Sequence, residues 1–303
     1  MKPGLPSSLS EGRAWEGFGT LTQALSSGLA SGMPLLGWLV CISAVFLLVG
    51  PTFASFEIEA RSPSVSGSLT SACVGLVRPQ PSSLNPEIEP VSANNAIGGF
   101  AYRPFGIRDI DFAGVWSAIS FGNRRLGLCY WRLAALTYEE HSLTMRYRLV
   151  YPNLILWPSV RLGYVSLDGE YLDGAMLLDL VSIAQVDPGL RLFAETRNLL
   201  AGRSFGSHEQ CTVTNRLGLG LRLTSHLAVG FEITKVGGEP TSVASGFEFE
   251  LGRFCLARCG ARSFPCEYAC GLSLHLGGFR FDIASRINPE IGLTHEVGCA
   301  YEW

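Results

Sequence analysis

The sequence predicts an all-β protein, built as an antiparallel transmembrane β-barrel of about 14 strands with an N-terminal lumen plug. Three observations predict this fold. Apolar side chains alternate with glycine or charge over long stretches, and segments of about ten residues recur between turn residues. In addition, only 16% of the 303 residues are charged, against about 25% in ordinary soluble domains.

The alternation is clearest on the two sides of Thr224–His226. Leucine occupies every second position of Leu217–Leu223, and apolar residues occupy every second position of Leu227–Ile233. A period of two places successive side chains on opposite faces of a sheet, so one face here is wholly apolar. Such a face is stable in contact with lipid, and a sheet is stable in lipid only as a closed barrel, which has no unpaired edges. The alternative is a soluble β-sandwich, whose strands would need polar outer faces.

Residues 1–54 are predicted to be an N-terminal extension and a secretory signal peptide. The apolar run Leu35–Val49 is shorter than the about 20 residues that a spanning helix needs. Small residues follow it, which predicts cleavage before Ser55. The basic residues lie far upstream of the run, which a true start at Met33 in place of Met1 would explain. The alternative is a retained membrane anchor.

Residues 55–95 are rich in proline and serine and show no long periodic pattern. Such a composition is typical of a disordered linker. The functional interpretation is a periplasmic segment that folds into the barrel lumen as a plug, and the family resemblance described below favours it.

Residues 96–303 are predicted to form the barrel. Each of their segments is close to the about 9–11 residues that a membrane strand needs. The predicted strands are Ala96–Arg103, Asp109–Phe121, Arg124–Ala134, Tyr138–Val150, Leu154–Val165, Gly174–Ala184, Gly189–Leu200, Cys211–Leu223, His226–Val236, Ser242–Leu251, Arg253–Arg262, Cys266–Leu276, Gly278–Ile287 and Gly292–Trp303.

The breaks between these segments alternate in length. Longer breaks such as Ser166–Asp173 and Ala201–Gln210 alternate with tight ones such as Gly122-Asn123 and Gly277. Outer-membrane barrels have short periplasmic turns and longer outer loops. The alternation therefore predicts an even number of strands, with both ends of the barrel on the periplasmic side.

Apolar residues such as Phe247, Phe249, Leu272 and Leu274 are predicted to face lipid. A charge that faces hydrocarbon at mid-depth costs about 2–4 kcal/mol, so the charged side chains at the alternate positions should face the lumen. There they form either a structural network or a selectivity filter. The lumen candidates are Arg146, Arg148, Arg161, Arg216, Arg222, Glu232, Glu248, Arg280, Asp282 and Arg286.

The chain ends in a pattern of Gly298 followed by two aromatic residues at alternate positions, Tyr301 and Trp303, the second of which is the last residue. This pattern resembles the signal by which outer-membrane barrels are recognised for assembly. Aromatic side chains at a strand end also suit an anchoring ring at the level of the lipid headgroups.

Several motifs resemble the FadL/PorV superfamily of fourteen-stranded bacterial outer-membrane barrels. They are Pro81–Pro86, Leu227–Glu232, Gly271–Asp282 and Pro289–His295, and the resemblance extends from Ser66 to the C-terminus. The resemblance implies that Ser83, Leu84, Asn85 and Pro86 belong to the plug.

The resemblance also implies a function in the bacterial outer membrane, after cleavage of the signal peptide. One branch of the family passes small hydrophobic compounds passively across this membrane, and this is the expected function. The alternative is a non-transporting structural or protein-secretion accessory barrel. The expected partners are outer-membrane lipid, the barrel-assembly machinery and a hydrophobic small-molecule ligand.

The sequence predicts no catalytic residues, no cofactor, no metal site and no nucleic-acid binding. The five histidines are scattered, and a triad is recognised by geometry and not by the presence of its residue types. Phosphate-binding and dinucleotide-binding motifs are missing from the sequence. An outer-membrane enzyme, the third hypothesis, would need His, Ser and Asp clustered at the outer rim.

Four cysteines, Cys255, Cys259, Cys266 and Cys270, have the spacing of a metal site. Residues four apart on a strand lie about 13 Å apart, so one zinc ion cannot bind all four at about 2.3 Å. One hairpin register would place Cys255 opposite Cys270 and Cys259 opposite Cys266, and would allow two disulfides in an oxidising compartment. The alternative is four small, unpaired, membrane-compatible side chains.

Overall fold

The computed structural model describes residues 63–70, 72–74, 76–77, 95–122, 124–199 and 211–303. The predicted signal peptide, the choice of start between Met1 and Met33, and the plug motif Ser83–Pro86 lie outside the described residues. Among the described residues, no helix is both long enough and apolar enough to cross a membrane.

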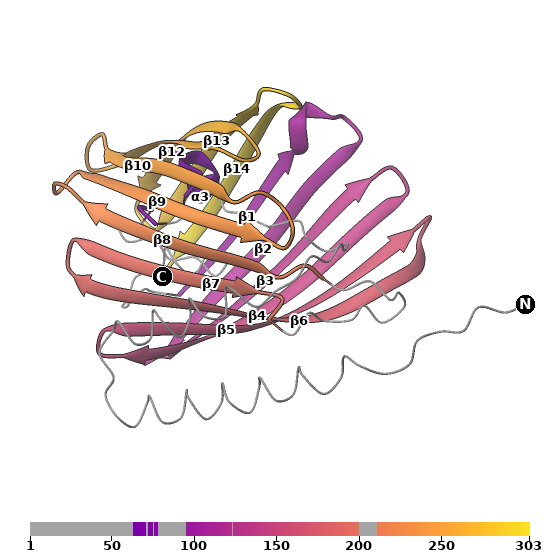
Figure 1. The fold of residues 1–303 in the computed structure, drawn as a ribbon, viewed down its shortest axis with the longest axis horizontal. Helices are drawn as coiled ribbons and strands as arrows, with labels where there is room; N and C mark the ends of the chain where they lie inside the picture. Colours follow the sequence, from indigo (N-terminus) through magenta and orange to yellow (C-terminus); the bar gives the residue numbers. More distant parts are fainter. Residues whose placement is uncertain (1–62, 71, 75, 78–94, 123, 200–210) are drawn as a thin grey trace, which may run out of the picture. The chain divides into compact units, whose positions relative to one another are not determined.

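The strands form one closed barrel, in which neighbours in sequence pair antiparallel and β1 closes on β14 (Figure 1). The prediction of a closed barrel of 14 antiparallel strands is confirmed. The strands are β1 (Ala96–Arg103), β2 (Ile110–Phe121), β3 (Arg124–Ala135), β4 (Tyr138–Tyr151), β5 (Leu154–Leu167), β6 (Glu170–Asp187), β7 (Leu190–Arg197), β8 (Thr214–Arg222), β9 (Leu227–Val236), β10 (Ser242–Glu250), β11 (Cys255–Arg262), β12 (Glu267–Leu276), β13 (Phe279–Asn288) and β14 (Gly292–Glu302). A short 3-10 helix, η2 (Pro104–Gly106), joins β1 to β2.

The two ends of the barrel differ in their connections. The end that carries the β2–β3, β8–β9 and β12–β13 turns also carries both chain ends of the barrel, because Trp303 N donates to the Asn95 carbonyl at 3.0 Å. We call this the turn end. The opposite end, which carries the connections after β1, β7, β9 and β11, is the loop end.

One predicted loop at the loop end is wrong. Residues 166–173 were expected to be a longer break, but β5 continues to Leu167 and β6 begins at Glu170. Asp168 and Gly169 form the turn, with φ angles of 52° and 80°. Positive φ at both central residues suits a two-residue hairpin, and Asp-Gly is a preferred sequence for it. The strands therefore extend to the turn itself.

Each strand presents one exposed and one buried face. The exposed positions carry large apolar side chains, as at Phe247 and Phe249 on β10, while Glu248 between them is fully buried. In a closed single-layer sheet, the shielded face is the interior. The outer face is therefore apolar and the inner face carries most of the charge, as expected where lipid surrounds a barrel.

A short helix, α3 (Pro63–Ser68), and the residues after it contact the interior of this barrel. Proline at the first position suits a helix start, because its fixed φ is helical and it has no N–H to satisfy. α3 contacts strands β10–β14, and Val65, Leu69 and Cys73 have no solvent-exposed surface. We call the described residues 63–70, 72–74 and 76–77 the inner segment.

A row of glycines on the inner face receives the inner segment. Gly220, Gly230, Gly246 and Gly260 are consecutive cross-strand partners on β8–β11. A Cβ at Gly246 or Gly260 would overlap the backbone oxygen of Ser68, and one at Gly230 would lie 2.7 Å from Cys73 N. The row therefore lets the inner segment lie against the backbone of the barrel wall.

The hairpin register that would have placed both cysteine pairs face to face is not formed. Cys259 is the cross-strand partner of Cys270, Cys255 is opposite Leu274, and Cys266 lies in the connection before β12. The expected register would have drawn Pro265 into the ladder, where it has no N–H to donate. No disulfide joins any two of the eight described cysteines.

The corrected register leads to a testable expectation about Cys259 and Cys270. The His275 N–H donates to the Phe254 carbonyl at 2.8 Å, which makes the opposed cysteines a non-hydrogen-bonded pair. Cα atoms of such a pair lie about 4.5 Å apart, within the span of a disulfide. We expect copper-phenanthroline to join these two cysteines, as measured by peptide mapping with mass spectrometry. Replacement of Cys270 by serine should abolish the link, and a link from Cys255 to Cys270 would contradict the register.

Candidate functional site in the barrel lumen

A chain of four charged side chains crosses strands β7–β9 on the inner face. Arg216 Nη1 lies 2.6 Å from Glu195 Oε2, and Arg216 Nε donates to Glu232 Oε1 at 3.0 Å. Arg197 Nε donates to Glu195 Oε1 at 2.7 Å. Glu195 and Arg216 are direct cross-strand partners, which explains why they meet. Positive and negative charges alternate, so each buried charge has an opposite neighbour.

A second polar chain crosses strands β10–β13. Glu248 and Arg258 are cross-strand partners, and Arg258 Nε donates to Glu248 Oε2 at 3.0 Å. Arg258 also donates to the Ser273 hydroxyl, which donates in turn to Asp282. Asp282 accepts a further bond from Arg280 Nε at 2.9 Å. These residues lie at buried positions of the inner face.

A third group lies nearer the loop end, on β11–β14. Glu267 Oε2 lies 3.7 Å from Arg262 Nη1, and Glu267 Oε1 lies 3.6 Å from Arg286 Nη1. Arg286 Nη2 lies 2.7 Å from Glu296 Oε1. Ion pairs therefore run along the inner face from β7 to β14.

The predicted lumen residues differ in their surroundings. Arg286 is half-buried within the third group, and Arg146 is half-buried on β4. Arg222 is exposed at the turn end, opposite the buried Ala228. Arg148 lies 6.0 Å from the ring of Trp157. Arg148 is buried, and so is each of the remaining candidates: Arg161, Arg216, Glu232, Glu248, Arg280 and Asp282.

Several partners of these residues were not predicted from the sequence. Glu195, Arg258, Glu267 and Glu296 are all buried on the inner face. Arg258 lies among small residues in Cys255–Arg262, where the apolar alternation is too weak to assign a face. A position-by-position assignment from the neighbouring strands could have found these residues, because a period of two continues across the whole strand.

The inner face of strands β1–β3 is mainly aromatic, although it also carries the fully buried Arg125 on β3. Phe112 stacks on Trp131 with centroids 5.1 Å apart and on Tyr102 with centroids 4.6 Å apart. Phe100 lies 5.8 Å from Phe112, and the buried Trp116 belongs to the same cluster. We call these five residues the aromatic patch.

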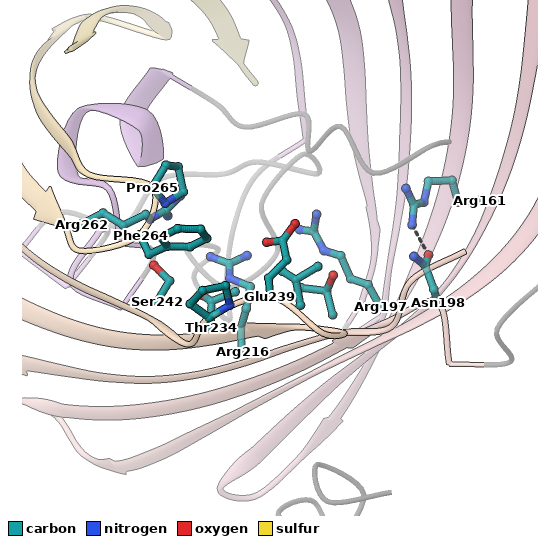
Figure 2. A pocket seen from close by; sticks show the side chains of 13 residues that line it. Arg161, Arg197, Asn198, Arg216, Thr234, Glu239, Ser242, Arg262, Phe264 and Pro265 are labelled. Atoms are coloured by element: carbon teal, nitrogen blue, oxygen red, sulfur yellow. Dashed lines mark hydrogen bonds between the residues drawn. The ribbon is translucent and has the colours of Figure 1, made fainter. Parts of the chain in front are cut away.

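A cavity of about 210 Å³ lies at the loop end of the lumen. Strands β5 and β7–β11 supply its walls, together with the β9–β10 and β11–β12 connections. Figure 2 shows its side chains, and the dashed line marks the 2.6 Å bond from Arg161 Nη2 to Asn198 Oδ1. The polar residues that line the cavity are Arg161, Arg197, Asn198, Thr214, Arg216, Thr234, Glu239, Ser242 and Arg262.

Three polar contacts hold the backbone of the inner segment. Arg262 Nη2 donates to the Leu69 carbonyl at 3.2 Å, and Arg191 Nη1 donates to the Val74 carbonyl at 3.1 Å. The Val77 N–H donates to Glu248 Oε1 at 3.4 Å. Two of these barrel residues also belong to the ion-pair groups described above, so the inner segment and the charged wall share partners.

Among its described residues, the inner segment carries one cysteine, Cys73, which lies against the barrel wall at Gly230. Burial raises the pKa of the Cys73 thiol far above its usual range. Because the thiolate is the reactive form, Cys73 should resist alkylation while the inner segment stays in place.

The C-terminal residues lie at the turn end. Tyr301 and Trp303 are exposed on the outer face and stack with centroids 6.0 Å apart, and Phe279 lies 4.7 Å from Tyr301. A Cβ at Gly298 would lie 3.1 Å from Pro63, at the start of α3. Within the described part of the chain, no group of three or more His, Cys, Asp or Glu side chains could hold a metal ion.

Comparisons with known proteins identify similar folds and no family. No protein-family model and no curated protein matches the sequence. The structure resembles the deltaS2S3 mutant of the TodX monoaromatic hydrocarbon channel, with a TM-score of 0.59 at 9% identity, covering 82% of this chain and 100% of that chain. The CymD monoaromatic hydrocarbon channel has a TM-score of 0.56 at 9% identity, covering 82% and 99%. The Ralstonia pickettii toluene transporter TbuX has a TM-score of 0.55 at 10% identity, covering 82% and 100%.

Proposed function

We propose that this chain is a bacterial outer-membrane channel of FadL/PorV type, through which small hydrophobic compounds pass. The similar folds include channels and a transporter for such compounds, and the apolar outer face of the barrel suits a lipid environment. Outer-membrane lipid and the barrel-assembly machinery, acting on Gly298, Tyr301 and Trp303, are proposed as partners.

The observation that carries this proposal is the division of the inner wall. The inner wall is apolar at the aromatic patch on β1–β3, whereas the wall from β7 to β14 is charged. The path of an apolar compound through the lumen is least unfavourable beside aromatic side chains. Beside the charged wall, the compound would have to displace the hydration or the ion partners of the charged groups. The path is therefore proposed to follow β1–β3.

The inner segment is proposed to act as part of a plug that comprises residues 55–95. It lies against the glycine row, and Ala72 and Cys73 also pack in hydrophobic clusters with wall residues such as Trp157 and Ala228. Three hydrogen bonds between its backbone and side chains of the wall hold it, each worth about 0.5–3 kcal/mol net. Such an attachment suits a segment that leaves or shifts to open the lumen.

Liposome flux tests the proposed passage. We expect proteoliposomes to admit small hydrophobic solutes faster than protein-free liposomes, and to discriminate against charged solutes of the same size. Deletion of residues 55–95 should raise the flux of all solutes, because it would remove the plug. If neither the full chain nor the deletion variant admits any solute, passage is excluded.

A second candidate is a structural or protein-secretion accessory barrel that transports nothing. The ion pairs that run from β7 to β14 favour it, because a wall of paired charges stabilises a barrel without requiring a path. In this case the partner would bind at the loop end. Absence of flux, together with a folded barrel, would support this candidate.

A further inference from the structure

We propose that the outer face of strands β1–β4 binds a lipid headgroup that carries two phosphate groups on a sugar core. The contact lies at the loop end, where charged side chains interrupt the apolar outer face. They form two ion pairs, Arg103 with Asp111 and Arg132 with Glu139, and we call these four residues the outer ion-pair row. The proposal rests on the outer-membrane location of the barrel and not on the passage of any solute.

The outer ion-pair row marks the level of the lipid headgroups at the loop end. On β3, Arg124 and Arg132 are eight residues apart, so both point to the outer face. The outward positions between them are apolar: Leu126, Leu128 and Tyr130. Eight residues span about 27 Å along a strand, and a tilt of about 40° reduces this to about 20 Å across the membrane. With the reach of two long side chains, this distance matches the apolar band of about 25 Å in outer-membrane barrels, which places Arg132 at one headgroup level and Arg124 at the other.

The two acids of the row lie at the same height on the barrel. Asp111 and Glu139 are the two cross-strand partners of Ala134, the first on β2 and the second on β4. Two strand spacings therefore separate them, which is about 10 Å. The small side chain of Ala134 lies between them. Each acid contacts its own guanidinium, so the two cationic groups are held on opposite sides of Ala134.

Both arginines keep hydrogen-bond donors for a ligand. Arg103 contacts Asp111 through Nε, and Arg132 contacts Glu139 through Nη2. Within the described part of the chain, these are the only hydrogen bonds that either guanidinium donates. A guanidinium has five N–H donors, so four remain on each arginine. The side chains of Arg103 and Arg132 are 59% and 48% exposed, so these donors are accessible from the surrounding lipid.

Two phosphate groups on one headgroup suit these donors. Phosphate oxygens accept hydrogen bonds, and the planar fork of a guanidinium matches them in a bidentate way. Because each arginine is held by its own acid, one phosphate does not span the gap of about 10 Å between the two ion pairs. A sugar core with a phosphate at each end does span it, and its uncharged middle then faces Ala134. We therefore infer a doubly phosphorylated glycolipid and not a phospholipid with a single phosphate.

Polar side chains continue on both sides of the arginines. The cross-strand partners of the two arginines are both histidines, His295 on β14 and His141 on β4. His295 Nδ1 lies 2.9 Å from Ser285 Oγ, and His141 Nδ1 lies 2.7 Å from Tyr130 Oη. Imidazole and hydroxyl groups both donate and accept hydrogen bonds, as sugar hydroxyls do. The surroundings of the arginines therefore suit a sugar-based headgroup better than an alkyl chain.

Native mass spectrometry of the full chain in detergent tests this surface without any measurement of flux. The probes are lipid A with two phosphates, the same lipid with one phosphate, and phosphatidylglycerol. A chelator is present, so that no divalent cation bridges Asp111 or Glu139 to the lipid. We expect the doubly phosphorylated lipid A to bind about tenfold more tightly than either other probe, because its second phosphate adds a charge-assisted contact.

Arg132→Gln is the test variant, because it removes one of the two cationic groups and leaves the other pair in place. We expect it to weaken binding of the doubly phosphorylated lipid A about tenfold, to the level of the singly phosphorylated form. Arg124→Gln is the matched control. Arg124 lies on the same face of the same strand and is also exposed, but at the turn end, so its replacement should leave this binding unchanged.

Equal binding of the two forms of lipid A, or tighter binding of phosphatidylglycerol, would overturn the proposal. Equal weakening by Arg132→Gln and Arg124→Gln would also overturn it, because binding would then reflect net charge and not the outer ion-pair row. The flux result remains separate. A protein that distinguishes the two forms of lipid A and admits no solute supports this surface and rejects the channel, and a protein that admits solutes without distinguishing the lipids does the reverse.

Discussion

Replacement of both Gly246 and Gly260 by alanine is expected to displace the inner segment from the barrel wall. A Cβ at either position would overlap the Ser68 carbonyl oxygen, which is a backbone atom and cannot rotate away. Overpacking of this kind costs about 1–3 kcal/mol per site. Alanine suits a strand no worse than glycine, so the barrel itself should stay folded.

The labelling rate of Cys73 reports this displacement. Its thiol is fully buried in the inner segment and its pKa is raised by that burial. We expect the double variant to react with maleimide roughly tenfold faster or more, because 1.4 kcal/mol changes an opening equilibrium tenfold. Peptide-resolved mass spectrometry separates Cys73 from the exposed cysteines of the outer face.

Gly99→Ala is the control for this experiment. Gly99 lies on β1, and a Cβ there would meet Gly114 and Val115, at 3.3 Å or more, and no atom of the inner segment. Its replacement should leave Cys73 protected. Equal protection of Cys73 in the control and in the double variant would show that the inner segment does not rest on the glycine row. Faster labelling together with higher solute flux would connect the segment to the proposed plug.

Replacement of Arg216 by leucine is expected to destabilise the barrel by about 3–5 kcal/mol, because it removes the buried guanidinium that two buried acids share. Arg216 is 1% exposed and contacts Glu195 and Glu232, which are 2% and 0% exposed. Urea unfolding of the barrel in detergent, followed by tryptophan fluorescence, measures the change in the free energy of unfolding.

Two further variants distinguish the buried pair from a general effect of charge. Arg103→Leu removes an arginine whose ion pair with Asp111 is 59% and 60% exposed, so its loss should cost at most about 1 kcal/mol. Addition of Glu232→Gln to Arg216→Leu should restore part of the stability, because the buried charge of Glu232 is removed while Glu195 keeps its pair with Arg197. Similar losses for Arg216→Leu and Arg103→Leu would contradict the described burial.

The hairpin β11–β12 shows how much the sequence could predict. The true register and the expected one differ by an even number of residues, and such a shift leaves every side chain on the same face. The face of a residue therefore follows from the period of two, as with Glu248 between Phe247 and Phe249. The partner of Cys270 does not follow from it, because the register depends on how many residues the turn takes.

The cavity could not have been predicted for a similar reason. Its arginines are separated by up to a hundred residues in the chain, between Arg161 and Arg262. They meet because the barrel closes and because strand pairing brings successive hairpins to the same height. The glycine row was visible as isolated glycines in several strands, but its alignment across β8–β11 depends on four registers at once.

The amino-acid sequence by itself determined that alternate side chains are apolar over 14 segments, and hence that the chain forms a closed barrel with a polar interior. That inference is local, since it needs only the geometry of one strand and the cost of an apolar face in water. The tertiary structure alone decided which charges pair, where the inner segment rests and where the arginine cavity lies. These contacts join residues far apart in sequence, and their positions depend on the register of every strand between them.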